Sequence, residues 1–248
     1  NSDHWCGSKS AMLADYFPAS NIAIIDKPTI KEYGIMKITV LGAAGNAGSR
    51  VVIEALSRGH EVTAVVRKLR GSNNLPAGVR ILTGDAGNVE DVATMSAGQD
   101  VVISAIRPAP DNKSETVANT NALMDGLTQT GVRLLIVGGA ATLTVPGTRG
   151  KTVMEDSNFL PVSARHIGKA SAEQLEACLA ETRVDWAYLS PAAHFAPGER
   201  TGNYRLGADE LLLDAEGNST ISMEDAAVAL VDEAERPKHH RTRFTAAY

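Results

Sequence analysis

Short apolar runs alternate with segments of helical periodicity between residues 36 and 190 of the chain. Continuous apolar runs are typical of parallel strands covered on both faces, whereas apolar residues spaced three and four apart predict helices. Strands are predicted at Lys37–Leu41, Glu61–Val66, Arg80–Thr83, Asp100–Ala105, Arg133–Val137 and Asp185–Leu189. Helices are predicted at Ser49–Ser57, Val89–Ser96, Thr116–Thr130 and Ile167–Glu181. This alternation predicts right-handed crossovers and one doubly wound parallel sheet of the α/β class.

The last quarter of the chain departs from this alternation. A loop and short strands are predicted within Gly198–Arg205, Leu211–Leu213 and Arg243–Ala246. Ile221–Val231 predicts a helix, with Ser222 as the N-cap and Asp225 at the capping-box position three residues later. We expect a small C-terminal lobe here that covers the substrate and is too small to form a separate domain.

Residues 1–35 do not share the pattern of the rest of the chain. They lack sustained periodicity and contain Pro18 and Pro28. No basic region followed by a compact apolar run precedes Met36, so a secretory signal fits poorly. We interpret residues 1–35 as an N-terminal extension, either an appended segment or a genuine arm that packs on the domain or on a neighbouring subunit. Residues 36–248 are expected to form one domain.

Gly42, Gly45 and Gly48 lie at the turn between the first predicted strand and the first predicted helix. In the dinucleotide-binding turn of a Rossmann domain, the first glycine allows a tight bend and the second lets the backbone approach the pyrophosphate. The third lets the helix pack closely, and the helix N-terminus offers N–H groups to the anion. The spacing differs from the usual G-x-G-x-x-G, and the alternative is an ordinary βα turn. The candidate cofactor contacts are these glycines with Ala44, Asn46 and Ala47.

Arg67 ends the second predicted strand, where an NAD-specific protein usually carries an acidic residue that binds the ribose hydroxyls. An arginine there can instead form charge-assisted hydrogen bonds to a 2′-phosphate. Lys68 and Arg70 add positive charge nearby. We therefore predict a preference for NADP(H) over NAD(H); the alternative is a solvated basic loop that leaves the preference open.

Two further strand ends are candidates for cofactor contacts. Asp85 and Ala86 follow the third strand, where Asp85 could bind the adenine amino group or could equally cap the next turn. Ala105, Ile106 and Arg107 end the fourth strand, at the crevice where open α/β sheets bind ligands. Arg107 could approach a phosphate or an acidic substrate, or could be solvated.

The composition is typical of a cytoplasmic protein that acts on small molecules. The chain has 248 residues, of which 44% are hydrophobic, and its net charge of −5 gives no electrostatic footprint for nucleic acid or for an anionic membrane. No apolar run reaches the roughly 18 residues of a membrane span. Cys6 and Cys178 fit neither a disulfide framework nor a metal site, and His239 and His240 are expected to be solvated. We expect a monomer or a homodimer.

Residues 36–248 resemble the atypical short-chain dehydrogenase/reductase proteins. Within that family the chain is most similar to bacterial proteins assigned as NAD(P)H-flavin reductases and, more distantly, to biliverdin reductase B. The motifs that carry the resemblance are Gly42–Gly48, Val66-Arg67, Gly84-Asp85, Ser190-Pro191, Pro197–Arg205 and Ile221–Asp225. The resemblance implies a Rossmann-like domain, an NAD(P)H-dependent oxidoreductase and a cofactor contact from Pro191.

The chain lacks the proton-delivery groups of the family's conventional members. These carry a serine after the fifth strand and Tyr-x-x-x-Lys on the next helix. Here Gly139 stands where the serine is expected, and Arg165 takes the place of the tyrosine before Lys169. A conventional alcohol dehydrogenase is therefore not expected. Hydride transfer to a flavin fits better, because the flavin ring stabilises the resulting charge and the protein supplies mainly proximity and orientation.

His166 and His194 are the nearest counterparts of two histidines in biliverdin reductase B. Either could donate a hydrogen bond or a proton to the acceptor, or could be a surface or pocket residue without a chemical role. The candidate catalytic residues are His166, His194 and Lys169. Three charged residues of the last quarter could line the substrate entrance or fix the lobe through ion pairs, namely Glu199, Arg200 and Arg205.

These features predict an NADPH-dependent oxidoreductase that transfers hydride to a flavin such as FMN or to another planar conjugated acceptor. The sequence contains no second glycine-rich phosphate site, so we expect flavin to be a transient substrate. One alternative is a non-catalytic NADP(H)-binding regulator or redox sensor, which the loss of the serine and the tyrosine fits equally well. Another is an isomerase or dehydratase, for which no acid/base residues are found.

Overall fold

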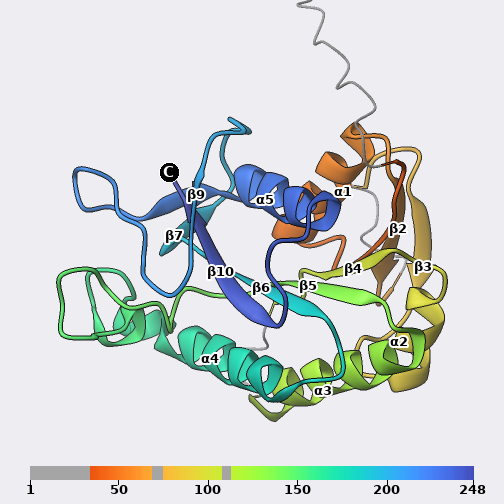
Figure 1. The fold of residues 1–248 in the computed structure, drawn as a ribbon, viewed down its shortest axis with the longest axis horizontal. Helices are drawn as coiled ribbons and strands as arrows, with labels where there is room; N and C mark the ends of the chain where they lie inside the picture. The colour runs from red at the N-terminus through yellow and green to blue at the C-terminus, as the bar shows by residue number, and fades with distance from the viewer. Residues whose placement is uncertain (1–33, 69–74, 108–112) are drawn as a thin grey trace, which may run out of the picture. The chain divides into compact units, whose positions relative to one another are not determined.

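The computed structural model describes residues 34–68, 75–107 and 113–248 (Figure 1). The predicted extension, apart from Gly34 and Ile35, therefore lies outside the described residues. Arg70, which was predicted to add positive charge near Arg67, lies outside them too. The larger sheet contains β1 (Lys37–Leu41), β2 (Glu61–Val66), β3 (Arg80–Thr83), β4 (Val101–Ser104), β5 (Arg133–Val137), β6 (Trp186–Pro191), β8 (Arg205–Gly207) and β10 (Thr242–Ala247). A smaller sheet pairs β7 (His194–Ala196) with β9 (Thr220–Ser222). The helices are α1 (Asn46–Ser57), α2 (Val89–Ser96), α3 (Lys113–Thr130), α4 (Arg165–Ala180) and α5 (Met223–Glu235), with 3₁₀ turns at Val153–Glu155 and Val162–Ala164.

Within the described residues, the larger sheet has eight strands in the order β3-β2-β1-β4-β5-β6-β10-β8. Each neighbouring pair is parallel except β10 and β8, which run antiparallel. The order reverses at β1 and β4, as in a doubly wound sheet, and crevices at such a point bind ligands. The predicted Rossmann-like α/β fold is confirmed.

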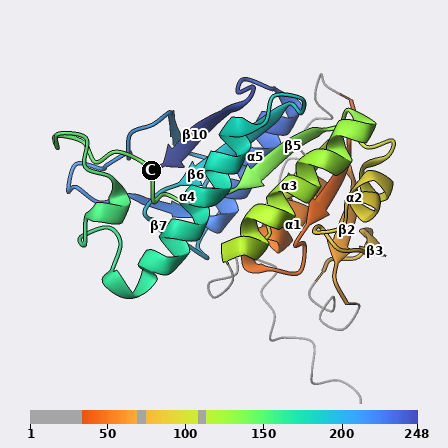
Figure 2. The same ribbon diagram turned by 90° about the horizontal axis from the view of Figure 1, so that it is seen from below.

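Helices cover both faces of the sheet. Figures 1 and 2 show α1 and α5 on one face and α2, α3 and α4 on the other. On the first face, Val52 of α1 and Leu230 of α5 are buried together with Val40 of β1. On the second, Leu127 of α3 and Cys178 of α4 are buried. The two apolar layers explain why the central strands have continuous apolar sequences.

The last quarter of the chain differs from the prediction. Residues 211–213 form no strand, whereas β7, β8 and β9 are short strands in that region. The predicted strand at 243–246 is present as β10, and it pairs with β6 inside the main sheet. The helix α5 packs against α1. Most of this region therefore completes the Rossmann sheet, while β7 and β9 form a small sheet of their own.

The capping prediction for α5 is half confirmed. The Ser222 hydroxyl accepts a hydrogen bond from the N–H of Asp225 at 2.9 Å, as expected for an N-cap. The Asp225 carboxylate does not return to the cap. It accepts hydrogen bonds from the N–H groups of Thr201 and Gly202 and from the hydroxyl of Tyr248. Asp225 is fully buried, so its carboxylate ties three segments of the chain together.

His239 is not a solvated tail residue, which corrects the prediction for it. The ring of His239 stacks on Phe244 with 4.5 Å between ring centroids, and its Nδ1 lies 2.8 Å from Glu233. His240 is exposed and lies 3.0 Å from Asp185. Both rings pair with carboxylates because β10 follows α5 closely and runs beside β6. Among the described residues there is no cluster of three potential metal ligands.

A charged network joins α1 to α5 and to the loop before β8. Arg58 donates hydrogen bonds to Glu54 at 2.8 Å and to Asp232 at 2.6 Å, and Arg200 donates to Glu54 at 2.6 Å. Burial raises the pKa of Glu54, but the hydrogen bonds from Arg200 and Arg58 outweigh burial and bring the pKa below its usual value. The pKa of Asp232 is lowered in the same way, against burial, by Tyr204 and Arg58.

We expect this network to make the protein sensitive to acid. A carboxylate whose pKa is lowered by folding stabilises the fold fully above its unfolded pKa of about 4, and this contribution is lost as the pH falls through the folded pKa. Glu54→Gln should lower the free energy of unfolding at pH 7 by about 1.5–3 kcal/mol, because Arg58 and Arg200 lose the buried carboxylate that accepts their hydrogen bonds. The variant should also lose less stability than the parent between pH 6 and pH 3. Urea unfolding across this range measures both effects, and equal acid losses in the two proteins would contradict the assignment.

A cleft at the carboxyl edge of the sheet

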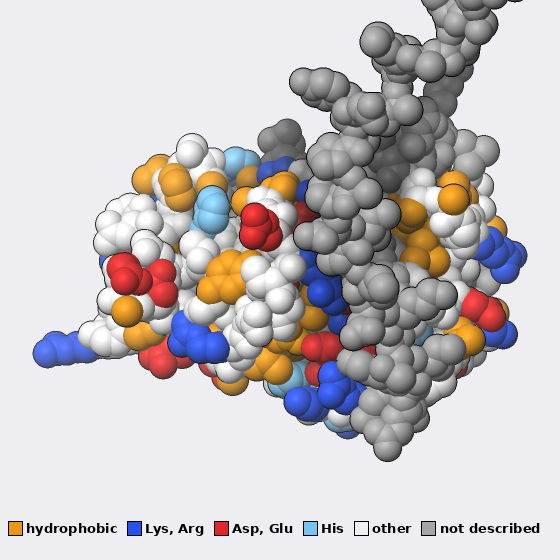
Figure 3. Space-filling view, turned by 90° about the horizontal axis from the view of Figure 1, so that it is seen from above, with side chains coloured by type: hydrophobic (Ala, Val, Ile, Leu, Met, Phe, Trp, Pro, Cys, Tyr) orange, Lys and Arg blue, Asp and Glu red, His pale blue; other side chains and the backbone are white. Residues whose placement is uncertain are grey.

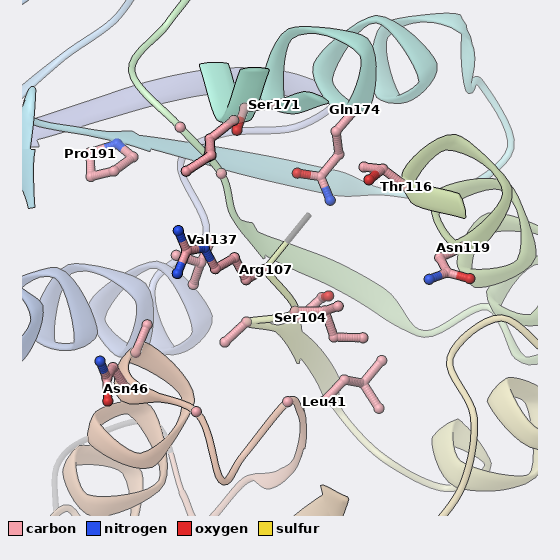
Figure 4. Close-up of a pocket in the computed structure, with 18 of the residues that line it drawn as sticks. Leu41, Asn46, Ser104, Arg107, Thr116, Asn119, Val137, Ser171, Gln174 and Pro191 are labelled. Atoms are coloured by element: carbon pink, nitrogen blue, oxygen red, sulfur yellow. The ribbon is translucent and has the colours of Figure 1, made fainter. Parts of the chain in front are cut away.

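The carboxyl ends of the central strands meet at one edge of the sheet because the strands are in register. Leu41 of β1 pairs with Val65 of β2 and with Ser104 of β4, which in turn pairs with Ile136 of β5. A cleft of about 1450 Å³ opens along this edge (Figure 4). Pockets for one small molecule usually measure roughly 300–1000 Å³. The cleft is therefore large enough for a dinucleotide together with a second molecule.

The glycine turn forms one wall of the cleft, and its shape depends on the absence of side chains. Gly42 has φ +73°, and a Cβ there would lie 2.9 Å from the carbonyl oxygen of Ala105. A Cβ on Gly45 would lie 3.2 Å, and one on Gly48 2.2 Å, from the carbonyl oxygen of Gly42. The N–H groups at the start of α1 thus approach the cleft closely, as binding of a pyrophosphate requires. The turn fits a dinucleotide.

Three basic side chains line the cleft. Arg67 and Lys68 follow β2, and Figure 4 shows Arg107 extending from the end of β4 into the middle of the cleft. None of them forms an ion pair with another residue in the described part of the chain. Cations that have no carboxylate partner beside a phosphate-binding turn are suited to further anionic groups.

Asp85 and Ala86 also line the cleft, after β3. The Asp85 carboxylate accepts a hydrogen bond from the N–H of Gly87 at 3.0 Å, which closes an Asx turn. Asn88, three residues after Asp85, caps α2 by accepting from Asp91. The structure therefore gives Asp85 the turn-forming role, and its contact with adenine stays a prediction.

Two buried hydroxyl groups line the cleft without a hydrogen-bond partner among the described residues. They belong to Ser104 at the end of β4 and to Thr116 on α3, which are 1% and 5% exposed. An unpartnered buried polar atom costs about 1–3 kcal/mol, so such atoms usually have a partner in the functional state. A polar ligand in this cleft would supply one.

The predicted cofactor contacts converge on this cleft. Of the thirteen, all but Gly48 line it, and Gly48 shapes the turn behind it. The lining residues among them are Gly42, Ala44, Gly45, Asn46, Ala47, Arg67, Asp85, Ala86, Ala105, Ile106, Arg107 and Pro191. Their roles as cofactor contacts remain predictions, but the fold brings them together.

The predicted catalytic residues are not brought to the cleft. His166 and Lys169 lie on the exposed face of α4, where Lys169 lies 3.9 Å from Glu173. His194 is exposed on β7, while its neighbours Ala193 and Phe195 line the cleft. The side chains of Glu199, Arg200 and Arg205 do not line the cleft either; Arg200 instead pairs with Glu54, the ion-pair role considered for it.

Sequence reasoning missed the face of α4 that does line the cleft. This face carries Ile167, Gly168, Ser171 and Gln174, and Ala164 of the preceding 3₁₀ turn lines the cleft beside it. Ile167 and Ser171, which are four residues apart, line the cleft, whereas Arg165 and Lys169 do not. The signal was the run of small or polar residues at helical spacing around Gly168, whose added Cβ would lie 2.7 Å from Leu160.

The described residues of the cleft fall into two halves. The half at β1 to β4 carries the glycine turn and the basic residues. The half formed by the β5 loop, α4 and the segment after β6 is mainly apolar and includes Phe159, Leu160 and Phe195. One wall is therefore suited to phosphates and the other to a flat apolar ring system.

A family model for NAD(P)H-binding proteins matches residues 42–237. The chain belongs to the NAD(P)H-binding family. The matched residues include the glycine turn at the carboxyl end of β1. The predicted resemblance to NAD(P)H-binding proteins, among them a bacterial protein named as a flavin reductase, is confirmed.

Relatives of this NAD(P)H-binding protein share nearly the whole described fold. The uncharacterized protein YwnB of Bacillus subtilis is 37% identical over 214 residues, covering 85% of this chain and 97% of YwnB. The crystal structure of a "putative epimerase" from Bacteroides thetaiotaomicron is 41% identical with a TM-score of 0.78, covering 86% of this chain and 97% of that one. A "putative NADH-flavin reductase" from Streptococcus pneumoniae is 33% identical with a TM-score of 0.75, covering 86% and 99%.

The surface seen in Figure 3 carries charges of both signs. Basic and acidic side chains are interspersed over the part of this face that the grey atoms leave visible. In the described ranges, no helix combines the length and the apolar character that crossing a bilayer requires. The predicted cytoplasmic location and the predicted lack of nucleic-acid and membrane partners stay predictions.

Proposed function

We propose that the protein is an NADPH-dependent oxidoreductase that reduces a flavin such as FMN, or another planar conjugated acceptor, which binds as a transient substrate. The observation that carries this proposal is the division of one continuous cleft into a phosphate-binding half and an apolar half. The name of the Streptococcus relative supports the choice of flavin.

The glycine turn and the N-terminus of α1 would hold the pyrophosphate, and Arg67 with Lys68 would bind the 2′-phosphate of NADPH. These two cations support the preference for NADPH over NADH. Arg107 lies between the two halves, where it can neutralise a phosphate of either molecule. The hydroxyls of Ser104 and Thr116 offer further hydrogen bonds to the bound molecules.

The reduced nicotinamide supplies a hydride, which carries two electrons, and the acceptor takes up this hydride and one proton from solvent. Among the described lining residues, no ionisable side chain comes from the apolar half: Arg67, Lys68 and Asp85 belong to the cofactor half, Arg107 lies between the halves, and Glu115 comes from α3. An acceptor ring that stabilises the added negative charge itself suits the apolar half, whereas a simple ketone needs an acid beside its oxygen. The residues of this half would orient the ring and exclude water.

We expect NADPH to be oxidised by FMN at least about tenfold faster with the purified protein than in a protein-free control, because one cleft that holds both reactants accelerates their reaction. The rate is measured as the loss of NADPH absorbance, with and without FMN. Heat-treated protein serves as a second control. Tight NADPH binding without turnover on FMN or on a quinone would contradict the proposal and favour the redox-sensor alternative.

A further inference from the structure

Ser171 of α4 occupies the space beside the β5 loop that a side chain at position 139 would need. A Cβ added to Gly139 would lie 2.7 Å from Oγ and 2.8 Å from Cβ of Ser171. Residue 139 and residue 171 cannot both carry a side chain of ordinary size here. The loop after β5 carries Gly139 where a serine was expected, and the hydroxyl at this point of the cleft comes instead from Ser171 of α4.

The polar ends of Ser171 and Gln174 belong to the cleft. Both residues line it although they are only 6% and 5% exposed, and Figure 4 shows the amide of Gln174 extending from α4 towards the strands. No described residue forms a hydrogen bond with the Ser171 hydroxyl or with the Gln174 amide nitrogen. Two donors of one largely buried helix face thus remain available to a ligand in the cleft.

Tyr188 of β6 holds this part of α4 in place. Its buried hydroxyl lies 3.1 Å from the carbonyl oxygen of Ser171 and 3.3 Å from Oε1 of Gln174, and the two acceptors share its single proton. It also accepts from the N–H of Gly139 at 3.3 Å. Burial raises the pKa of Tyr188, so the hydroxyl keeps its proton and its donor role at neutral pH. The contact with Oε1 leaves the amide nitrogen of Gln174 as the end that faces the cleft.

The surroundings strengthen any hydrogen bond formed here. Ala141, Phe159 and Leu160 line the same part of the cleft. A hydrogen bond in such an apolar environment is electrostatically stronger than one in water, and an unpaired donor there is costly. A ligand that lacks a matching acceptor atom would leave both donors unsatisfied.

We propose that Ser171, supported by Gln174, determines which acceptors bind, by donating hydrogen bonds to a carbonyl oxygen on the edge of the acceptor ring. This inference rests on the proposed function and narrows its acceptor class to ring systems that carry carbonyl groups, such as flavins and quinones. Conjugated carbonyl oxygens gain negative charge when such a ring accepts hydride. Donors placed beside these oxygens therefore stabilise the reduced ring as well as the oxidised ring that binds first.

The test compares two planar tricyclic ligands, lumiflavin, which has ring carbonyls, and methylene blue, which has none. Their dissociation constants are measured by fluorescence titration in the presence of NADP⁺, so no turnover is needed. The variants are Ser171→Ala and Ser171→Cys, because cysteine keeps a side chain at this position but is a weak donor. Ser163→Ala is the matched control, since Ser163 is exposed and does not line the cleft.

We expect both Ser171 variants to bind lumiflavin about 5–10-fold more weakly, as loss of one hydrogen bond predicts, while binding of methylene blue changes less than about twofold. The affinity for NADP⁺ and the behaviour of Ser163→Ala should match the parent. Unchanged lumiflavin affinity in Ser171→Ala, an equal loss for both ligands, or no lumiflavin binding by the parent would overturn the inference.

The outcomes separate this inference from the proposed function. A parent protein that binds lumiflavin through Ser171 but oxidises no NADPH contradicts the reductase proposal and retains the carbonyl-binding site. A parent protein that reduces FMN while Ser171→Ala binds lumiflavin normally contradicts the site alone.

Discussion

Gly48→Ala is expected to weaken NADPH binding by at least about 30-fold, or about 2 kcal/mol. The added Cβ would lie 2.2 Å from the carbonyl oxygen of Gly42, and this atom belongs to the backbone and cannot rotate away. The turn and the start of α1 must therefore separate by about 1 Å, a displacement that already impairs sites built on exact positioning. The N–H groups at the helix terminus would then no longer reach the pyrophosphate together. Isothermal titration with NADPH measures the loss.

The control for this variant lies at the other end of the same helix. Gly59 has φ +85°, and an added Cβ there would meet no atom within 4 Å. Gly59→Ala should cost roughly 1–2 kcal/mol of stability through its left-handed backbone and leave NADPH affinity unchanged. If Gly48→Ala bound NADPH as tightly as Gly59→Ala does, the glycine turn would not be the pyrophosphate site.

Arg67→Asp is expected to reverse the cofactor preference. The guanidinium lines the cleft after β2 with no carboxylate partner among the described residues. Hydrogen bonds to a charged group contribute about 1.5–3 kcal/mol, so the variant should bind NADPH roughly 10–100-fold more weakly. NADH, which lacks the 2′-phosphate, should bind within about threefold of the parent, because the new carboxylate can accept from the ribose hydroxyls.

Arg80→Asp makes the same change of charge at the opposite edge of the sheet. Arg80 begins β3, pairs with Thr63 in β2 and does not line the cleft. A general electrostatic effect would weaken NADPH binding in both variants, whereas a contact with the 2′-phosphate would affect Arg67→Asp alone. The dissociation constants of both variants for NADPH and for NADH distinguish these two explanations. An unchanged ratio in Arg67→Asp would remove Arg67 from the cofactor site.

The fold and the cofactor wall of the cleft could be predicted because both depend on local sequence. Continuous apolar runs identified the strands, and α2 begins and ends at the predicted residues, 89 and 96. The glycine turn could be recognised because its three positions each meet a local steric requirement. Arg67 lies in the cleft because it directly follows β2, a strand whose register follows from its apolar pattern.

The acceptor wall could not be predicted in the same way because it depends on how α4 is rotated about its axis. That rotation follows from contacts of α4 with residues outside the helix, such as Gly168 against Leu160 and Ser171 against Tyr188. A family motif anchored on Lys169 gave a register that turns the wrong face to the cleft. An ion-pair role was considered for Arg200, but its partner Glu54 could not be identified from the sequence, and neither could the partner of His239, because both partners belong to other elements.

The packing of α1 against α5 has a consequence for folding during synthesis. The first helix of the domain and its last helix share one apolar layer, although roughly 170 residues separate them, as Arg58 and Asp232 illustrate with a separation of 174. A growing chain therefore exposes the apolar side of α1, and the unpaired edge of β6, until its final segment has been made. Contacts between such distant segments slow folding and leave intermediates that are prone to aggregate. For this protein, release from the ribosome and completion of the fold should nearly coincide, and chaperones that shield apolar surface should act on it late in translation.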